Sequence, residues 1–320
     1  MVPDISIIVP IYNQERFLYD SLLSIKNNLF TNYEVILVND GSTDQSEKIC
    51  KKFCDEDSRF KYFRKDNNGV ASARQFGLNV SNGKYLIHVD PDDRVEPDYL
   101  SEMFINAIST KADIVICDYF EEYDEQTKIV SHRAFCGMTL QDLKLELAEG
   151  AFWGVCWNKL IKSDIIKGKV DFAPHINFQE DKLFIFRALC EAKKVSFVQR
   201  PLYHYNRANP DSILTSITFE KAAQVWPVRQ LILAEESGLF NRLRLSNRLI
   251  NLRSVMELTL SEGVSNADFQ KTINQFRLVI FLKSISQRRI NLKTRLIGLF
   301  SSLGVSVRVF QFVMRIKHKY

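Results

Sequence analysis

Three carboxylates stand close together directly after an apolar run in the first third of the chain. The run 84–89 is rich in β-favouring residues, and Asp90, Asp92 and Asp93 follow it, with Pro91 between the first two. Such a run is typical of a buried parallel strand, whose carboxyl end lies at the ligand-binding edge of an open α/β sheet. Carboxylates this close repel one another unless a cation or a proton offsets their charge. The pattern therefore fits a divalent-metal site that also holds phosphate oxygens, and equally an acidic turn before a helix.

Another carboxylate, Asp40, follows the apolar run 33–38 and precedes Gly41. There it can accept hydrogen bonds from a base imide or from ribose hydroxyls, or it can cap the next helix. No G-x-G-x-x-G follows the first apolar run and no G-x-x-x-x-G-K-[ST] occurs, which argues against a dinucleotide-binding Rossmann domain and a P-loop kinase. A consistent arrangement has uridine at Asp40 and a diphosphate held through a cation at Asp92.

The elements that must position these residues alternate between strands and helices. We expect strands at 5–11, ending near Pro10, and at 33–38, 60–63, 85–89 and 113–117, with helices at 16–29, from near Asp44 onward, at 70–80 and at 98–109. This alternation over residues 1–118 predicts a parallel, doubly wound α/β sheet. Residues 119–210 are less regular, with helices expected at 140–148 and 180–192, short strands at 195–198 and 202–205, and part of a hairpin at 130–135.

From residue 219 onward the pattern is almost entirely helical, so we expect a catalytic domain over 1–212 and a helical region over 213–320. The nucleotide-binding half would occupy about 1–118 and the acceptor-binding half about 119–212. Residues 269–320 contain eleven Lys or Arg and no Asp or Glu, and subtracting them leaves 32 basic against 38 acidic residues elsewhere. A basic tail interleaved with Phe, Leu, Val and Ile predicts an amphipathic segment that lies on an anionic membrane surface, and argues against nucleic acid as a partner.

The six cysteines form no C-x-x-C pair and no Cys/His metal spacing, so a disulfide framework is not expected and a reducing cytoplasm fits best. An expected strand from Ile5 leaves no room for a signal peptide before it. The basic segment 296–314 contains Arg308 and lacks about 20 clean apolar residues, so we expect peripheral attachment at the inner face of the membrane rather than a spanning helix.

Several spaced motifs resemble glycosyltransferase family 2, the large inverting family with the GT-A fold. They are Pro10–Glu15 (PIYNQE), Val38–Asp44 (VNDGSTD), Asn68-Gly69 with Ala73-Arg74, Asp90–Asp93 (DPDD), Trp157–Leu160 (WNKL) and Gln179–Phe184 (QEDKLF). Residues 3–110 carry the strongest match. The resemblance implies a Rossmann-like, mostly parallel GT-A domain, bacterial envelope-polysaccharide synthesis and a UDP-sugar donor.

Carried over position by position, the family's nucleotide-binding residues are Pro10, Tyr12, Glu15, Asp40, Asn68, Gly69, Arg74, Asp90 and Pro91. The family's DxD motif falls on Asp90, nearer the ribose, and on Asp92, which would bind Mn²⁺ or Mg²⁺. Pro91 replaces the more usual serine or alanine, which stiffens the turn without removing a ligand. Asp93 is expected to be structural.

The resemblance also assigns the catalytic base. Asp181, preceded by Glu180, matches the Glu-Asp pair that opens a helix, although Gln179 replaces the usual glycine. A single in-line displacement with one base would invert the anomeric carbon without a covalent intermediate. Acidic residues at a helix start can equally serve the helix dipole.

Other positions remain open between binding and structural roles. His204 is a further candidate metal ligand, Trp157 and Lys159 could face the acceptor, and Arg207 and Ser212 could lie on a loop over the diphosphate. The Q-x-x-R-W pattern of processive synthases does not occur, so the resemblance implies transfer of one sugar at a time to a glycan or lipid-linked acceptor.

Two other functions are weighed. A sugar-phosphate nucleotidyltransferase would need a glycine-rich, basic signature near the start of the chain, and none is present. A catalytically inactive, membrane-associated GT-A binding protein would have no need to keep Asp40, Asp90, Asp92 and Asp181 together.

Overall fold

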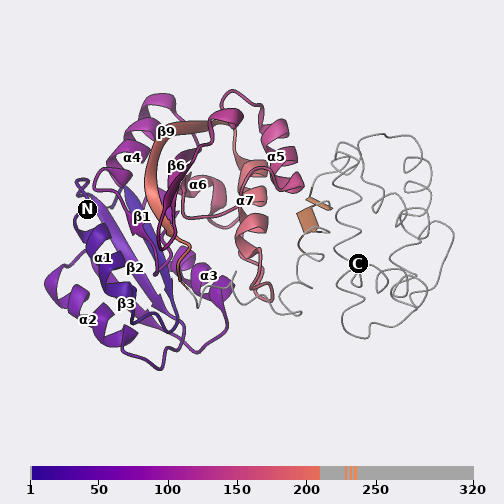
Figure 1. Ribbon diagram of the computed structural model, residues 1–320. Helices are drawn as coiled ribbons and strands as arrows, with labels where there is room; N and C mark the ends of the chain where they lie inside the picture. Colours follow the sequence, from indigo (N-terminus) through magenta and orange to yellow (C-terminus); the bar gives the residue numbers. More distant parts are fainter. Residues whose placement is uncertain (1, 210–227, 229–230, 233, 236–320) are drawn as a thin grey trace, which may run out of the picture. The chain divides into compact units, whose positions relative to one another are not determined.

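The computed structural model describes residues 2–209, 228, 231–232 and 234–235, which belong to one compact unit (Figure 1). The strands of this part are β1 (Ile5–Ile11), β2 (Tyr33–Asn39), β3 (Phe60–Arg64), β4 (Tyr85–His88), β5 (Arg94–Val95), β6 (Ile114–Glu122), β7 (Thr127–Val130), β8 (Lys159–Lys162) and β9 (Val195–Asn206). The helices are α1 (Leu18–Lys26), α2 (Ser46–Glu56), α3 (Val70–Val80), α4 (Tyr99–Thr110), α5 (Leu140–Glu149), α6 (Ser163–Ile166) and α7 (Glu180–Glu191), with a 3₁₀ turn at Arg133–Phe135.

The strands form one sheet in the order β3-β2-β1-β4-β8-β6-β9-β5, and β7 pairs with β6. The half made of β3, β2, β1 and β4 is parallel, as the alternation of strands and helices predicts. Beyond β4 the sheet is mixed, because β8 runs antiparallel to both of its neighbours while β6 and β9 are parallel. The PIYNQE, VNDGSTD, DPDD and WNKL motifs therefore lie on or next to strands of one continuous sheet.

Helices cover both faces of the parallel half, which explains why every residue of β1 is buried. Val9 belongs to a core cluster with Leu22 of α1 and Met103 of α4. Ile8, on the opposite face, lies so close to Gly77 that a Cβ there would be 2.5 Å from the Ile8 side chain, so α3 packs directly on the strand. In Figure 1, α1, α2 and α4 lie to one side of the strands, and α3 and α7 to the other.

Some element boundaries differ from those expected. The two short strands expected at 195–198 and 202–205 are one continuous strand, β9, whose register against β6 shifts near Asp118. Strand β8, within the WNKL motif, and the two-residue β5 were not predicted, because neither shows a long apolar run. A hairpin forms between β6 and β7, but of the range 130–135 expected in it only Val130 lies in a strand, and 133–135 form a 3₁₀ turn.

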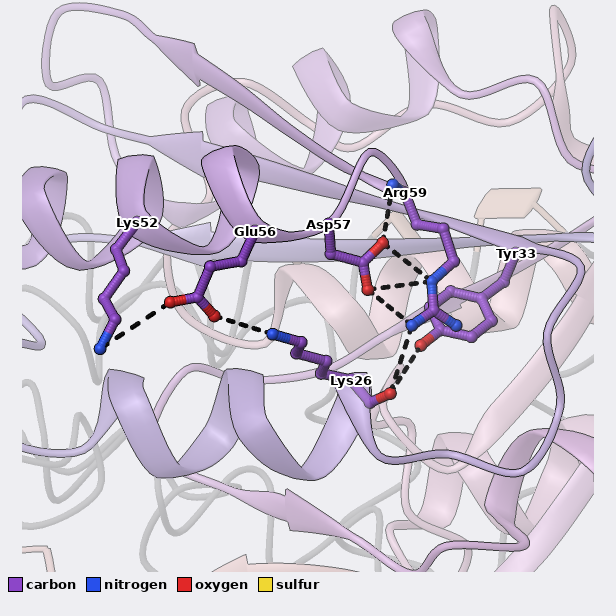
Figure 2. A network of polar contacts seen from close by, with 6 residues as sticks. All are labelled: Lys26, Tyr33, Lys52, Glu56, Asp57 and Arg59. Atoms are coloured by element: carbon purple, nitrogen blue, oxygen red, sulfur yellow. Dashed lines mark hydrogen bonds and ion pairs between the residues drawn. The ribbon is translucent and has the colours of Figure 1, made fainter.

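Polar contacts join α1, α2 and the turn before β3 at the outer edge of the sheet, as Figure 2 shows. Arg59 donates from Nη2 to Asp57 at 2.6 Å and to the carbonyl of Lys26 at 3.3 Å, and its guanidinium lies 4.4 Å from the Tyr33 ring centroid. Lys26 also pairs with Glu56 at 2.8 Å. These contacts fix the end of α1 against α2 and thereby support the loop after β1.

The predicted helical region 213–320 lies outside the described residues, apart from five positions between 228 and 235. Within the residues that are described, no helix combines the length and the apolar character needed to cross a bilayer.

Candidate active site

Asp40 lies at the carboxyl end of β2, and its buried carboxylate organises the loop that leads into α3. One oxygen accepts from the backbone N–H of Gly69 at 2.7 Å, and the other accepts from the N–H of Asn68 at 3.1 Å and pairs with Lys65. Gly69 adopts φ +87°, and a Cβ at this position would collide with the carboxamide of Asn177. The structure thus brings Asp40, Asn68 and Gly69 together, as predicted.

The loop after β1 is fastened to the loop after β2. Glu15 accepts from the N–H of Gln45 at 2.8 Å, and its own N–H donates to Asp44 at 2.9 Å. Pro10 continues β1 to Ile11 without strain, because the pairing of β1 with β4 ends at Ile8 and leaves the missing donor unneeded. The ring of Tyr12 remains 47% exposed beside this loop, so it is available to a ligand.

Asp93 supports the turn after β4. Its buried carboxylate accepts from the Tyr203 hydroxyl at 2.6 Å and from the N–H of Asn206 at 2.8 Å. The Tyr203 hydroxyl in turn accepts from the N–H of Asp90 at 3.1 Å. Burial raises the pKa of Asp93 well above its usual range, with a further contribution from Asp92. Asp93 is therefore structural, as expected, and fastens the acidic turn to β9.

The other two carboxylates of the turn have different environments. Asp92 accepts from the Asn209 carboxamide at 2.6 Å, whereas Asp90 accepts from Arg74 Nη2 at 2.8 Å. Burial, followed by the charge of Asp90, raises the pKa of Asp92 to about 6. Pro91 is buried between them and limits the conformations of the turn. The negative charge of Asp92 is thus only partly offset by the protein itself.

Arg74 connects this turn to the first turn of α7. The guanidinium is buried and pairs with Asp90 through one nitrogen and with Glu180 through the other. Gln179 precedes Glu180 with φ +61°, the left-handed region in which the glycine usual at this position would be unstrained. The ion pairs place Glu180 and its neighbour Asp181 near Asp90, although 106 residues separate Arg74 from Glu180.

Glu180 and Asp181 differ in their partners. Burial raises the pKa of both carboxyls, and the charge of Arg74 opposes that increase. Glu180 is engaged by Arg74, whereas Asp181 accepts a 2.7 Å hydrogen bond from the N–H of Lys182. A carboxylate with a raised pKa is a stronger base. Glu180 is already paired with Arg74, so Asp181 is the better candidate to accept a proton.

His204 lies on β9, and both of its ring nitrogens contact carboxylates. Nδ1 lies 2.6 Å from a Glu122 carboxylate oxygen and Nε2 lies 2.7 Å from one of Glu96, while the ring stacks on Phe120. Metal ligation by His204 would require one of these contacts to break.

The WNKL motif does not face an acceptor, because its side chains are buried. Trp157 is 3% exposed and stacks on Tyr203 with ring centroids 4.4 Å apart. Lys159 is fully buried, and its Nζ donates to the carbonyls of Trp153 and Val155 at 2.9 Å. The expectation that Trp157 and Lys159 contact the acceptor is therefore corrected: these side chains shape the loop before β8.

Arg207 follows β9, and its guanidinium lies 5.5 Å from the Tyr205 ring centroid and 6.0 Å from that of Tyr123. Ser212, the other residue expected on a closing loop, lies outside the described residues.

Asp90 and Asp92 could hold a divalent cation. In the described part of the chain, no group of three or more His, Cys, Asp or Glu side chains is placed to bind a metal ion. Two carboxylates fit Mg²⁺ or Mn²⁺ nonetheless, because such ions commonly take one or two carboxylates together with substrate phosphates and water. Burial and then the charge of Asp90 disfavour the ionised form of Asp92 and raise its pKa, and a bound cation would oppose both effects.

Sequence reasoning missed several residues that position the site. Tyr203 and Asn209 hold the acidic turn, Lys65 pairs with Asp40, and Asn177 limits the space at Gly69. The alternation of side chains along β9 could have indicated Tyr203, because Tyr203 and Tyr205 lie on the same face of that strand. The other contacts join segments far apart in sequence, so no local pattern indicates them.

Two solved structures with sugar nucleotides bound share this architecture. A crystal structure of residues 1–349 of S. aureus TarS in complex with UDP-GlcNAc superposes with a TM-score of 0.68 at 17% identity, covering 98% of this chain and 92% of that chain. The mannosyltransferase PcManGT from Pyrobaculum calidifontis, in complex with GDP-Man and Mn²⁺, gives 0.54 at 12% identity, covering 98% of this chain and 88% of its own. This likeness shows that the chain has the GT-A fold of these proteins.

Residues 6–184 match the model of glycosyl transferase family 2. EpsH of Bacillus subtilis (strain 168) is 33% identical over 248 residues, which are 74% of this chain and 71% of EpsH. The glycosyltransferase GlyG of Streptococcus pneumoniae serotype 4 (strain ATCC BAA-334 / TIGR4) is 28% identical over 79% of this chain and 89% of its own length. The chain belongs to glycosyltransferase family 2.

Proposed function

We propose that this glycosyltransferase moves a single sugar from a UDP-sugar to a hydroxyl of a glycan or lipid-linked acceptor, with inversion at the anomeric carbon. The observation that carries the proposal is the buried Arg74, which pairs with Asp90 at the end of β4 and with Glu180 at the start of α7. One ion-pair network thus joins the donor carboxylates to the segment that contains the candidate base.

The donor side is arranged for a uridine nucleotide. Asp40 and the N–H groups around Gly69 lie at the edge where β2 ends, and the exposed Tyr12 ring offers a stacking surface. TarS has been crystallised with UDP and with UDP-GlcNAc, and it shares this fold. We assign the base to Pro10, Tyr12, Glu15 and Asp40, the nucleotide side of the pocket to Asn68, Gly69 and Arg74, and the ribose side of the acidic turn to Asp90 and Pro91.

Asp181 is proposed as the general base. It would accept the proton of the acceptor hydroxyl while that oxygen attacks the anomeric carbon and the nucleoside diphosphate leaves from the opposite face. Glu180 would hold α7 in place through Arg74 instead of taking the proton. A single displacement of this kind inverts the anomeric configuration.

Asp92, together with Asp90, would hold a divalent cation. When bound, such a cation supplies neutralising charge to the diphosphate. The complex of PcManGT with GDP-Man and Mn²⁺ supports this assignment by analogy of fold. His204 is the weaker candidate ligand, since both of its nitrogens already lie on carboxylates.

Calorimetric titration of the full chain with UDP tests the donor site. We expect UDP to bind more tightly with Mn²⁺ or Mg²⁺ than with chelator, because the carboxylates otherwise repel the diphosphate. Asp92→Ala should lose this dependence on the metal, and Asp124→Ala, an exposed aspartate in the turn between β6 and β7, should behave as wild type. Equal UDP affinity with manganese and with chelator would contradict the proposal.

A further inference from the structure

One large aromatic side chain stands out near the candidate base. Trp153 lies in the loop between α5 and β8, and 37% of its surface is exposed. The backbone beneath the ring is held in place, because the buried Lys159 Nζ donates to the Trp153 carbonyl at 2.9 Å and to Asn158 Oδ1 at 2.7 Å. The ring is therefore presented from a fixed loop, which suits a binding surface.

The next residue sets the distance between this loop and the catalytic helix. A Cβ on Gly154 would lie 2.6 Å from the Cα of Lys182, the residue after Asp181. Only glycine allows the loop to approach α7 this closely. Trp153 is thus adjacent in sequence to a residue that touches the first turn of α7, where the proposed base is located.

A second ring meets Trp153 from β9. Tyr205 lies with its centroid 6.5 Å from that of Trp153 and its plane inclined by 73°. Tyr205 is itself fixed, because it stacks on the buried Trp157 at 5.4 Å and the Arg207 guanidinium lies over it. The two nearly perpendicular rings form a corner, which we call the Trp153–Tyr205 corner.

The corner lies near the donor carboxylates. Asn206, the residue after Tyr205, donates its N–H to Asp93 at 2.8 Å. Trp157 stacks on both Tyr205 and Tyr203, and the Tyr203 hydroxyl donates to Asp93 at 2.6 Å. Charged groups also border the corner, since Arg207 lies over Tyr205 and Tyr123, and the Tyr123 hydroxyl donates to Glu121 at 3.0 Å. A long alkyl chain would have to desolvate these groups, which is unfavourable.

We propose that the Trp153–Tyr205 corner binds a pyranose ring of the acceptor and that Trp153 determines acceptor recognition. A pyranose has apolar C–H faces and a rim of hydroxyl groups, so one face can rest on the negative face of an indole while the rim points away from it. The inference rests on the proposed function, because a sugar bound at the corner would present the hydroxyl from which Asp181 is proposed to accept a proton.

Saturation-transfer NMR on the full chain tests the corner with methyl α- and β-pyranosides of glucose, galactose and N-acetylglucosamine as probes. The experiment is run with and without UDP and Mn²⁺. We expect at least one pyranoside to receive saturation on the C–H protons of one ring face. Trp153→Ala should weaken its binding roughly tenfold, and Trp153→Phe should retain most of it.

The matched control is Tyr19→Ala, which removes an aromatic ring of similar exposure (41%) from α1. This variant should bind the pyranoside as wild type does, and all variants should keep wild-type UDP affinity. Absence of saturation on every pyranoside, or pyranoside binding that Trp153→Ala leaves as strong as in wild type, would overturn the inference. With octyl β-D-glucopyranoside, saturation of the alkyl chain but not the ring would likewise overturn it and assign the corner to a lipid. Failure of UDP binding, by contrast, would contradict the proposed function and not the corner.

Discussion

Arg74 holds two carboxylates that belong to different elements, and its own charge is fully enclosed by the fold. Removing one partner of a buried, hydrogen-bonded ion pair leaves an uncompensated charge and is strongly unfavourable. The pairing of Arg74 with Asp90 and Glu180 therefore keeps the turn after β4 and the start of α7 in a fixed relation. This dual role agrees with the raised pKa of Arg74, to which both carboxylates contribute against the cost of burial.

His88, on β4 beneath Arg74, gives the protein a pH-sensitive residue. Its imidazole packs against Phe172 and Phe184, and neither ring nitrogen has a hydrogen-bond partner in the described structure. Burial, with the nearby charge of Arg74, lowers the pKa of His88 well below 6.5. In the unfolded chain the imidazole takes a proton near pH 6.5, whereas in the folded protein it does not, so stability falls as the pH decreases through that value.

We predict that the free energy of unfolding decreases below pH 6.5 by as much as about 1.4 kcal/mol per pH unit on account of His88. His88→Leu should make this dependence shallower by that amount in urea titrations between pH 7.5 and 5. Phe172→Leu serves as the control, because it perturbs the same packing without removing a titratable group and should lower stability equally at each pH. An unchanged slope in His88→Leu would contradict the prediction.

At the scale of elements, sequence patterns predict the parts that repeat and miss those that depend on distant contacts. The parallel strands and the helices of the first 110 residues follow from apolar periodicity, and α7 was placed to within one residue. Strand β8 was missed because two of its four residues are lysines. One of them, Lys159, is buried, and its ammonium group donates to a carbonyl of the loop before the strand. Asp40 contacts Asn68 and Gly69, and Arg74 contacts Asp90 and Glu180, and this second link arises from tertiary packing.

The loop before β8 depends on Lys159. Burial lowers the pKa of Lys159 to about 8, which leaves the ammonium group charged at neutral pH. Lys159→Met would remove the donor to the Trp153 and Val155 carbonyls and to Asn158 Oδ1, and buried acceptors without a donor are costly. We predict a loss of about 3 kcal/mol in the free energy of unfolding.

Denaturant titration measures this effect, and Lys128→Met, at an exposed position on β7, is the control, which should remain within about 0.5 kcal/mol of wild type. A Lys159→Met protein as stable as wild type would show that the loop does not rely on the buried ammonium.

At the scale of the whole molecule, charge is divided unevenly along the chain. Residues 269–320 carry eleven of the 43 basic residues and none of the 38 acidic ones. The basic tail lies outside the described residues, so its role remains a proposal drawn from the sequence: attachment to the inner face of the membrane, near a lipid-linked acceptor. Each Lys or Arg close to an anionic leaflet contributes about 1 kcal/mol.

Liposome flotation measures that attachment. The full chain should float with anionic vesicles at low salt and be released at high salt, because the attraction is electrostatic. A version ending at residue 265 should stay at the bottom of the gradient under both conditions. Equal flotation of the two proteins, or none of either, would contradict the proposal.

The central claim is that Asp181 takes the acceptor proton beside a donor site built by Asp40, Asp90 and Asp92. The most direct measurement compares transfer rate and UDP affinity in Asp181→Asn, which keeps the size of the side chain but cannot accept the proton. We predict that transfer falls on the order of 10²-fold or more while UDP affinity stays near wild type. Glu180→Gln, which disturbs the Arg74 pair instead, should weaken UDP binding as well. Wild-type turnover in Asp181→Asn would contradict the account and require another base.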